Sequence, residues 1–249
     1  MMHDKENTIV YVVSHKDFTM PQLSNYVPIL AGASKNNSSI QPKDNTGDNI
    51  SDKNDSYCEL TAQYWVWKNT EEGNVGFVHY RRFFYESYNK KNIVSASQFS
   101  ADLCDYDLIL PEPDLFMDDI QIQYSKIHNS NDLLIVRDVI DHIYPQYIEA
   151  FDMLMKSHTM SCYNMFVMPR SMYRQYMNWL FQILSEVEKR IDVSTYDNYN
   201  KRIFGFISER LINVWVMKNK YKVKYYPVYK NDEIWWKKRF KTIVKKIIV

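Results

Sequence analysis

TIVYVV, at residues 8–13, is a continuous apolar run dominated by β-branched side chains. Such a run predicts a central strand of a parallel sheet that is buried on both faces. Ser14-His15-Lys16 follows directly, at the strand end where open α/β sheets bind their ligands. Two further buried strands are predicted at residues 75–79 (VGFVH) and 108–110, and both lead into charged or proline-containing loops. The sequence therefore predicts an α/β fold.

Helical and strand patterns alternate through the rest of the chain. A helix is predicted over residues 57–68, after a polar loop at 41–54. The spacing of apolar residues predicts helices at 132–142, 146–156, 171–190 and 202–217, and strands at 164–168 and 221–228. Because no repeat or low-complexity linker divides the sequence, we expect one mixed domain over residues 1–230.

The end of the chain differs in charge from the rest. Residues 235–249 (WWKKRFKTIVKKIIV) carry six basic and no acidic side chains, whereas residues 1–234 carry 25 basic and 30 acidic ones, a net charge of −5. On a helix, the apolar residues of this segment would share one face, which is typical of an amphipathic membrane-surface anchor. A helix packed on its own domain is the alternative. We treat residues 231–249 as a basic amphipathic tail.

Composition excludes several function classes. Only 5 of the 249 residues are glycine, and neither GxGxxG nor GxxxxGK[ST] occurs, which argues against dinucleotide-dependent dehydrogenases and P-loop NTPases. An acidic body without an RNP-like motif argues against nucleic-acid binding. The three cysteines are far apart and predict reduced thiols. Without a membrane-spanning run or a signal-peptide core, we expect the protein in the cytoplasm.

The segment His79-Tyr80-Arg81-Arg82 is the most informative cluster. It follows a predicted buried strand in a chain without a general basic surface. Planar guanidinium groups match diphosphate oxygens bidentately. If the segment is extended, alternation would point His79 and Arg81 one way and Tyr80 and Arg82 the other. Salt bridges to the acidic body are the alternative to a diphosphate site.

Three other clusters can carry chemistry, and each has a structural alternative. Ser14-His15-Lys16 could surround nucleotide phosphates, or be an ordinary exposed turn. The Asp-rich loop around Asp44 could contact substrate, or be a solvated loop. His128 and Asp132 would lie one turn apart on a helix, and Glu209 and Asp132 are the candidate general bases. A single carboxylate is otherwise a helix cap or an ion-pair partner.

At these clusters the chain resembles a bacterial family of capsule and exopolysaccharide glycosyltransferases that was once classed as of unknown function. The matching segments, spread over residues 9–215, are IVYVVSHK, DNTGDNISDKN, SYCELTAQYWVWKN, VGFVHYRRFF, YDLILPEP, HNSNDL, YNMFVM and RIFGFISERLINVW. The resemblance implies a GT-A-like fold, a Rossmann-type mixed sheet flanked by helices. It also implies a hexosyltransferase with a nucleotide-sugar donor, expected to be UDP-linked. UDP-galactofuranose is one candidate, since some relatives are galactofuranosyltransferases.

The resemblance also implies roles for individual residues. Nucleotide-sugar binding is expected of the strand-end and loop residues Val13, Ser14, His15, Lys16, Asp44, Asn49, His79 and Tyr80. The expected catalytic residues are Glu209, Asp132, Arg81 and Arg82, with Glu209 preferred narrowly over Asp132 as the base of an inverting reaction. Acceptor binding is expected of His128, Asn164 and Arg210.

The metal site of GT-A enzymes has no counterpart at the expected position. Such enzymes usually carry Asp-x-Asp at the strand end where this chain has His79-Tyr80-Arg81-Arg82. We expect Arg81 and Arg82, with His79, to stabilise the leaving diphosphate instead. Asp105-Tyr106-Asp107 precedes its strand, so no metal ligand is assigned, and a requirement for Mn²⁺ or Mg²⁺ stays open.

By the same resemblance, the acceptor is expected to be a polyprenyl-diphosphate-linked glycan at the inner leaflet of the membrane. The basic tail would then hold the enzyme at that membrane surface. Two other functions remain open. The chain could be a non-catalytic scaffold subunit that binds glycans or lipid head groups. It could also be a phosphotransferase, although it lacks the paired metal carboxylates that phosphoryl transfer usually needs.

Overall fold

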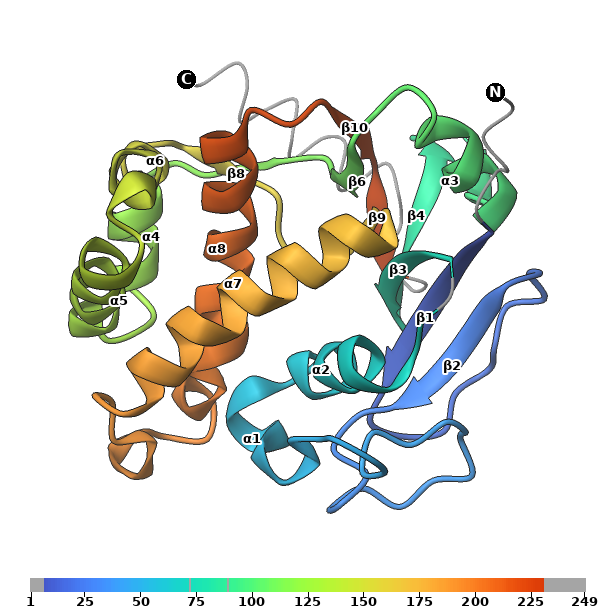
Figure 1. Ribbon diagram of the computed structural model, residues 1–249, viewed down its shortest axis with the longest axis horizontal. Coiled ribbons are helices and arrows are strands. Elements are labelled where there is room, and N and C mark those ends of the chain that lie inside the picture. Colours follow the sequence, from blue (N-terminus) through green and yellow to red (C-terminus); the bar gives the residue numbers. More distant parts are fainter. Residues whose placement is uncertain (1–6, 72, 89, 231–249) are drawn as a thin grey trace.

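The computed structural model describes residues 7–71, 73–88 and 90–230, so the predicted tail at 231–249 lies outside the described residues. A mixed sheet forms the centre of this part (Figure 1). Its main path is β10 (Val223–Tyr226), β6 (Leu108–Pro111), β9 (Phe166–Met168), β3 (Asn74–His79), β1 (Thr8–Ser14) and β2 (Tyr26–Leu30). β1 is parallel to β2 and β3, whereas β9 is antiparallel to β3 and β6.

An antiparallel extension continues the sheet beyond β3. β3 turns directly into β4 (Arg82–Ser87), which pairs with β11 (Val228–Lys230) and β5 (Lys90–Ile93). A separate small pair joins β7 (Asp114–Leu115) to β8 (Thr159–Met160). The turn between β3 and β4 places a charged loop beside the carboxyl end of β1.

The central strand β1 is buried on both faces, as its sequence predicts. Tyr11 and Val13 pack into a core shared with α2 (Leu60–Asn69), α7 (Arg170–Glu188) and α8 (Ile203–Asn219). Val10 and Val12 pack into a second core on the other face, where α3 (Ala96–Asp102) covers the strand. Alternate side chains of one strand thus enter two different cores, which is why the run is apolar throughout.

Further helices pack around α7 and α8. They are α4 (Ile120–Ser125), α5 (Ser130–Ile143) and α6 (Ile148–Met155), of which α5 contacts α7 and α6 contacts α8. Figure 1 shows this helical group beside the sheet, with α8 and α7 between the two. The body therefore has a strand-rich side and a helix-rich side.

Two predicted elements are wrong in detail. The expected helix at 57–68 is broken into α1 (Asn54–Tyr57) and α2, because Cys58 adopts a left-handed φ of 53°. The expected strand at 221–228 is two strands, β10 and β11, which pair with different partners. The strands β2 and β4 were not predicted. The other expected helices and strands are confirmed, with ends shifted by a few residues.

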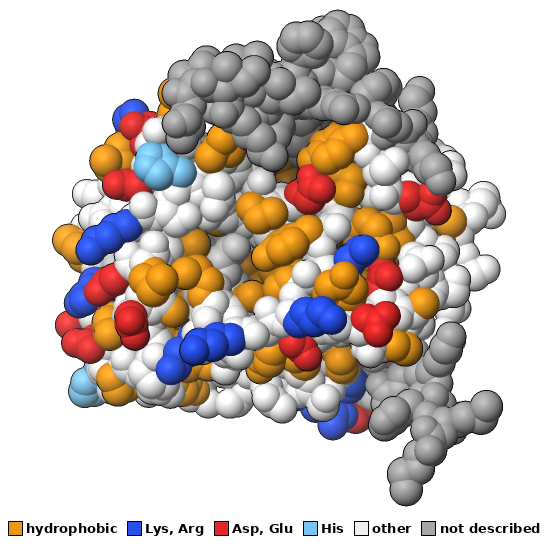
Figure 2. All heavy atoms as spheres, turned by 90° about the horizontal axis from the view of Figure 1, so that it is seen from above, with side chains coloured by type: hydrophobic (Ala, Val, Ile, Leu, Met, Phe, Trp, Pro, Cys, Tyr) orange, Lys and Arg blue, Asp and Glu red, His pale blue; other side chains and the backbone are white. Residues whose placement is uncertain are grey.

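The outer surface mixes charges of both signs. Figure 2 shows one such face, where lysine, arginine and acidic side chains are interspersed among apolar ones. Among the residues that the structure describes, no helix is both long enough and apolar enough to cross a membrane.

Candidate active site

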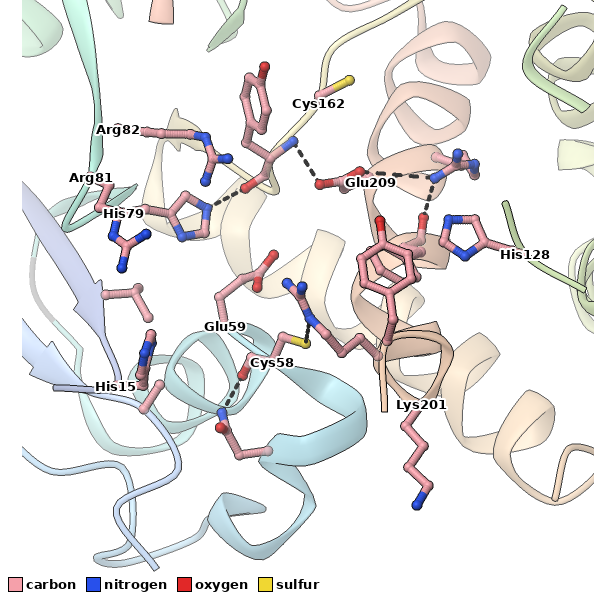
Figure 3. Close-up of a pocket in the computed structure, with 18 of the residues that line it drawn as sticks. His15, Cys58, Glu59, His79, Arg81, Arg82, His128, Cys162, Lys201 and Glu209 are labelled. Atoms are coloured by element: carbon pink, nitrogen blue, oxygen red, sulfur yellow. Dashed lines mark hydrogen bonds and ion pairs between the residues drawn. The ribbon is translucent and has the colours of Figure 1, made fainter. Parts of the chain in front are cut away.

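A cavity of about 1000 Å³ opens where the carboxyl ends of β1 and β3 face the amino-terminal half of α8. Its strand wall carries His15, His79, Arg81 and Arg82 (Figure 3). Its helical wall carries Glu209 and His128 on the opposite side, and Glu59 lies between the two walls. Sequence segments that lie far apart in the chain thus meet in one site.

The strand wall is built by a tight turn rather than by an extended segment. His79 and Arg82 are directly paired where β3 turns into β4, so the predicted alternation of side chains does not apply. The backbone N–H of Tyr80 donates to the carbonyl of Val13 at 3.1 Å, which ties this turn to the end of β1. The neighbouring Ser14 hydroxyl closes a second turn by accepting from the N–H of Lys16 at 3.2 Å. The ends of β1 and β3, which are neighbours in the sheet, therefore form one rim of the cavity.

Three arginines of this cavity have no carboxylate partner in the part of the chain that the structure describes. Within residues 7–71, 73–88 and 90–230, Arg81, Arg82 and Arg202 make no ion pair, whereas Arg137, Arg174 and Arg190 all pair with acids. Arg81 instead stacks on Tyr80 and Arg82 on Tyr163, with 4.8 Å from guanidinium to ring centre in both cases. The predicted salt-bridge alternative for Arg81 and Arg82 is therefore wrong for the described residues. The guanidinium groups of Arg81 and Arg82 are therefore available to bind an anion.

The side chain of His79 is hydrogen-bonded to the backbone of Tyr163. Its Nε2 lies 2.5 Å from the carbonyl oxygen of Tyr163 and donates to it. Burial lowers the pKa of His79, so the imidazole is neutral at physiological pH. Burial also lowers the pKa of His15, helped by the charges of Lys16 and Arg81. The positive charge of the rim at neutral pH therefore comes from the arginines.

Tyr163 and Asn164 form a left-handed pair that connects both walls. Their φ angles are 79° and 49°, a conformation that asparagine adopts more readily than most residues. The amide of Asn164 donates to Glu59 Oε1 at 2.7 Å and to the carbonyl of Gly205 at 2.9 Å, and its Oδ1 accepts from Ser208 at 2.9 Å. Asn164, expected to bind the acceptor, is buried and does not line the cavity.

Glu209 is a cavity carboxylate held by contacts to both of its oxygens. Its Oε1 accepts the N–H of Tyr163 at 3.0 Å, and Arg210 Nη1 lies 4.0 Å from Oε2. Although its side chain is still 22% exposed, desolvation raises the pKa of Glu209 to about 7, and the charge of Glu59 adds to the rise. A carboxylate with such a pKa accepts a proton efficiently near neutral pH.

Asp132, the alternative base, lies outside the cavity. Its carboxylate is buried and accepts hydrogen bonds from the hydroxyls of Tyr124 at 2.9 Å and Tyr196 at 2.6 Å. His128 precedes α5 and binds Asn200 Oδ1 through Nδ1 at 2.7 Å, so it is not on one helical turn with Asp132. The structure thus brings His128, Arg210 and Glu209 together in the cavity, but not Asp132.

The expected loop residues Asp44 and Asn49 also lie away from the cavity. Asp44 is buried and accepts from the N–H groups of Gly32 at 2.8 Å and Ala33 at 2.9 Å. Asn49 accepts from the N–H of Ser51 at 3.2 Å. The carboxylate of Asp44 and the carboxamide of Asn49 therefore stabilise the loop after β2. Lys16 does not line the cavity, whereas Val13, Ser14, His15, His79 and Tyr80 do.

The sequence reasoning missed several charged residues of the cavity, among them Glu59 and Arg202. Glu59 stands at the start of α2 because the left-handed Cys58 breaks the helix there. Arg202 precedes α8, and its Nε donates to Cys58 Sγ at 3.3 Å. Burial raises the pKa of Cys58 to about 12, so the sulfur stays a thiol. Both residues lie inside segments that carry the family resemblance, and this position was the one indication in the sequence that they belong to the site.

The described residues do not fit a resident divalent cation. No three His, Cys, Asp or Glu side chains of the described ranges are grouped closely enough to hold one. Asp107, of the formal Asp-x-Asp, instead joins the start of β6 to the strand beside it, since its Oδ2 accepts the N–H of Lys222 at 2.7 Å. The cavity presents the guanidinium groups of Arg81, Arg82 and Arg202.

A solved structure described as the apo form of the WbbM bifunctional glycosyltransferase resembles this chain. The TM-score is 0.81 at 28% sequence identity, and the match covers 91% of this chain and 46% of that one. The present chain thus spans about half the length of that protein. No curated protein matched the sequence. The likeness confirms the predicted GT-A-like fold, a central mixed sheet flanked by helices.

Like the match to the solved structure, the match to a protein family covers most of the chain. A family model covers residues 9–220, and this range includes every residue that lines the cavity. The chain belongs to the family described as a domain of unknown function, DUF4422, a glycosyltransferase-like family.

Proposed function

We propose that this protein is a glycosyltransferase that moves a sugar from a nucleotide-sugar donor to a hydroxyl group of a glycan acceptor. One observation carries the proposal. A carboxylate with a pKa of about 7, Glu209, faces across one cavity the guanidinium groups of Arg81 and Arg82, which have no ion-pair partner among the described residues. The likeness to the WbbM glycosyltransferase supports the same conclusion.

The strand wall would bind the donor. Open α/β sheets hold nucleotides at the carboxyl ends of their strands, which here are the ends of β1 and β3. Arg81 and Arg82, with Arg202 opposite, would neutralise the diphosphate as it leaves. Donors fixed in advance where charge develops stabilise a transition state by several kcal/mol, about 3–4 for one group. Their stacking on Tyr80 and Tyr163 holds the guanidinium groups in place.

The helical wall would activate the acceptor. Glu209 takes the proton of the acceptor hydroxyl as the acceptor oxygen bonds to the anomeric carbon of the donor. The bond between that carbon and the phosphate oxygen breaks, and its electron pair leaves with the nucleoside diphosphate. A single base and a single displacement invert the anomeric centre. The N–H of Tyr163 and the charge of Arg210 orient Glu209 for this step.

The finer identity of the substrates follows the family resemblance. We propose a UDP-linked hexose as donor, with UDP-galactofuranose as one candidate, and a polyprenyl-diphosphate-linked glycan as acceptor. Capsule or exopolysaccharide synthesis at the inner face of the cell membrane would be the setting. A scaffold subunit that binds glycans without catalysis is the alternative, favoured by the absence of a three-ligand metal site among the described residues.

A binding and turnover experiment separates these functions. Thermal stability of the purified protein is measured with UDP, GDP and their sugars, with added Mn²⁺ and with a chelator. At 100 times its Kd, a ligand adds about 2.7 kcal/mol to the free energy of unfolding. We expect stabilisation by UDP compounds in the presence of the chelator, and slow release of free sugar from the correct donor. A protein that no nucleotide stabilises would be a scaffold, and stabilisation only with Mn²⁺ would contradict the arginine mechanism.

A further inference from the structure

The helical wall holds a set of aromatic rings that the reaction chemistry does not use. His128 lies 4.3 Å from Phe206 and 5.7 Å from Tyr199, and Tyr199 lies 5.2 Å from Phe206, measured between ring centres. All three rings line the cavity. Tyr199 and His128 are stacked almost parallel, with an angle of 9° between their planes. We call these three residues the aromatic wall.

The loop before α8 fixes the aromatic wall in place. Asn200 binds His128 Nδ1 through its Oδ1 at 2.7 Å and donates through Nδ2 to Asp197 at 2.8 Å. Asp197 Oδ1 in turn accepts the N–H groups of Tyr199 and Asn200, both at 2.8 Å. Burial lowers the pKa of His128, so its ring is neutral at physiological pH. The wall is therefore prepared before any ligand arrives.

The wall combines an open aromatic face with polar groups. Tyr199 is 50% exposed although its ring contacts two others. Arg210, which lines the same part of the cavity, is only 4% exposed, and its buried Nε has no hydrogen-bond partner among the described residues. Gln123 and Lys201 also line this side. A ligand with only hydrocarbon surface would give the buried Nε of Arg210 no partner, which is costly.

The aromatic wall lies next to the proposed base. Phe206 precedes Glu209 by three residues on α8, so the two side chains are neighbours on one face of the helix. His128 lies on the same side of the cavity as Glu209, and Arg81 and Arg82 lie on the other (Figure 3). A ring placed against this wall would thus present its edge to Glu209 and Arg210, and not to Arg81 and Arg82.

We infer that the aromatic wall is a saccharide subsite that binds the terminal sugar ring of the acceptor, and that the face of this ring stacks on Tyr199. This inference rests on the proposed function. One face of a sugar ring carries C–H groups, which pack well on the electron-rich face of an aromatic ring. Its edge carries hydroxyls, which suit Glu209, Arg210 and Gln123. A nucleobase is the competing occupant, but the strand ends where nucleotides bind are on the opposite wall.

Substitutions at Tyr199 test the subsite. Because half of this side chain is exposed, Tyr199→Ala and Tyr199→Leu should fold. We expect both to raise the KM for the saccharide acceptor by about tenfold or more, since stacking on an aromatic ring contributes on that scale. Tyr199→Phe keeps the ring and should restore the KM to near the wild-type value. Tyr225→Ala is the matched control, since Tyr225 is 42% exposed and lies outside the cavity.

Two binding measurements keep this test separate from that of the proposed function. Saturation-transfer NMR detects binding of methyl glucoside, galactoside and mannoside to the protein alone, and calorimetry gives the Kd for UDP. We expect saccharide binding to be lost in Tyr199→Ala and the Kd for UDP to change less than twofold. Unchanged saccharide binding, or an equal loss of UDP binding, would overturn the subsite. A wild-type protein that binds UDP and no saccharide would overturn it too, and would leave the donor site standing. A protein that binds a saccharide through Tyr199 but no nucleotide would instead overturn the proposed function.

Discussion

The two walls of the cavity are built in different ways from the same chain. The strand wall takes its residues from two short runs, Ser14-His15 and His79-Tyr80-Arg81-Arg82, each directly after a buried strand. The helical wall takes Gln123, His128, Tyr199 and Glu209 from four separate segments. The strand wall carries arginines beside buried strands, and the helical wall combines aromatic rings with Glu209 and the basic side chains of Arg210 and Lys201. A continuous motif therefore marks one half of this site, and only the tertiary fold assembles the other.

The largest effect is expected on the helical wall, at the base. Glu209→Gln keeps the shape of the side chain and a hydrogen-bond acceptor for Tyr163, but it cannot take a proton. We expect kcat to fall by about 10²–10⁴-fold while the Kd for UDP is unchanged. Single-turnover kinetics and calorimetry check this. A variant with wild-type kcat would show that Glu209 is not the base, and that the helical wall does not activate the acceptor through this residue.

The next effect is expected on the strand wall. Arg81→Ala and Arg82→Ala each remove a cation that faces the leaving diphosphate, and we expect each to lower kcat/KM by about 10²–10³-fold. The control is Arg137→Ala, because Arg137 is an arginine already paired with Asp152, outside the cavity. It should keep full activity. Equal losses in all three variants would point to general destabilisation instead of a diphosphate site.

The pH dependence of the reaction rate should reflect the base on the helical wall and not the arginines on the strand wall. The base works only when deprotonated, and burial raises the pKa of Glu209 from 4.5 to about 7. Activity should therefore be lost as the pH falls through 7, by about tenfold for each further pH unit. The arginines keep their charge over this range. A rate that stays constant down to pH 5 would mean that a carboxylate with an ordinary pKa, or no carboxylate, is the base.

The smallest effect on catalysis is expected at Asp132, behind the helical wall. Asp132→Asn leaves one acceptor oxygen for the hydroxyls of Tyr124 and Tyr196. One buried hydroxyl then loses its partner, which costs about 1–3 kcal/mol in the free energy of unfolding. Urea denaturation should report this loss, and kcat should stay within about twofold of wild type, since the residue lies outside the cavity. A fall in kcat like that of Glu209→Gln would restore Asp132 as the base.

The strand wall could be predicted from the sequence because its signal is local. Continuous apolar runs identify β1 and β3, and polar residues at their ends lie at one sheet edge whatever the rest of the chain does. The turn at Tyr80-Arg81 was missed because it contains no glycine or proline. β2 was missed because it carries Pro28, which disfavours a strand in the sequence pattern and is tolerated at the edge of the sheet.

The rest of the site depends on packing that the sequence does not display. Glu59 enters the cavity only because Cys58 breaks a helix that the pattern predicts as continuous. Arg202 lines the cavity only because the start of α8 faces the ends of β1 and β3. In contrast, Asp44 and Asp132 have the residue type expected of a site, but they are buried where backbone amides or tyrosine hydroxyls satisfy them. Residue type alone does not separate a structural carboxylate from a reactive one.

A crystal structure with bound UDP tests the central claim most directly. We predict the diphosphate oxygens within hydrogen-bonding distance of Arg81 and Arg82, with the nucleoside against the end of β1 and the β-phosphate directed toward Glu209. Binding of UDP against Tyr199, with both arginines left without a phosphate contact, would contradict the assignment of the strand wall to the donor.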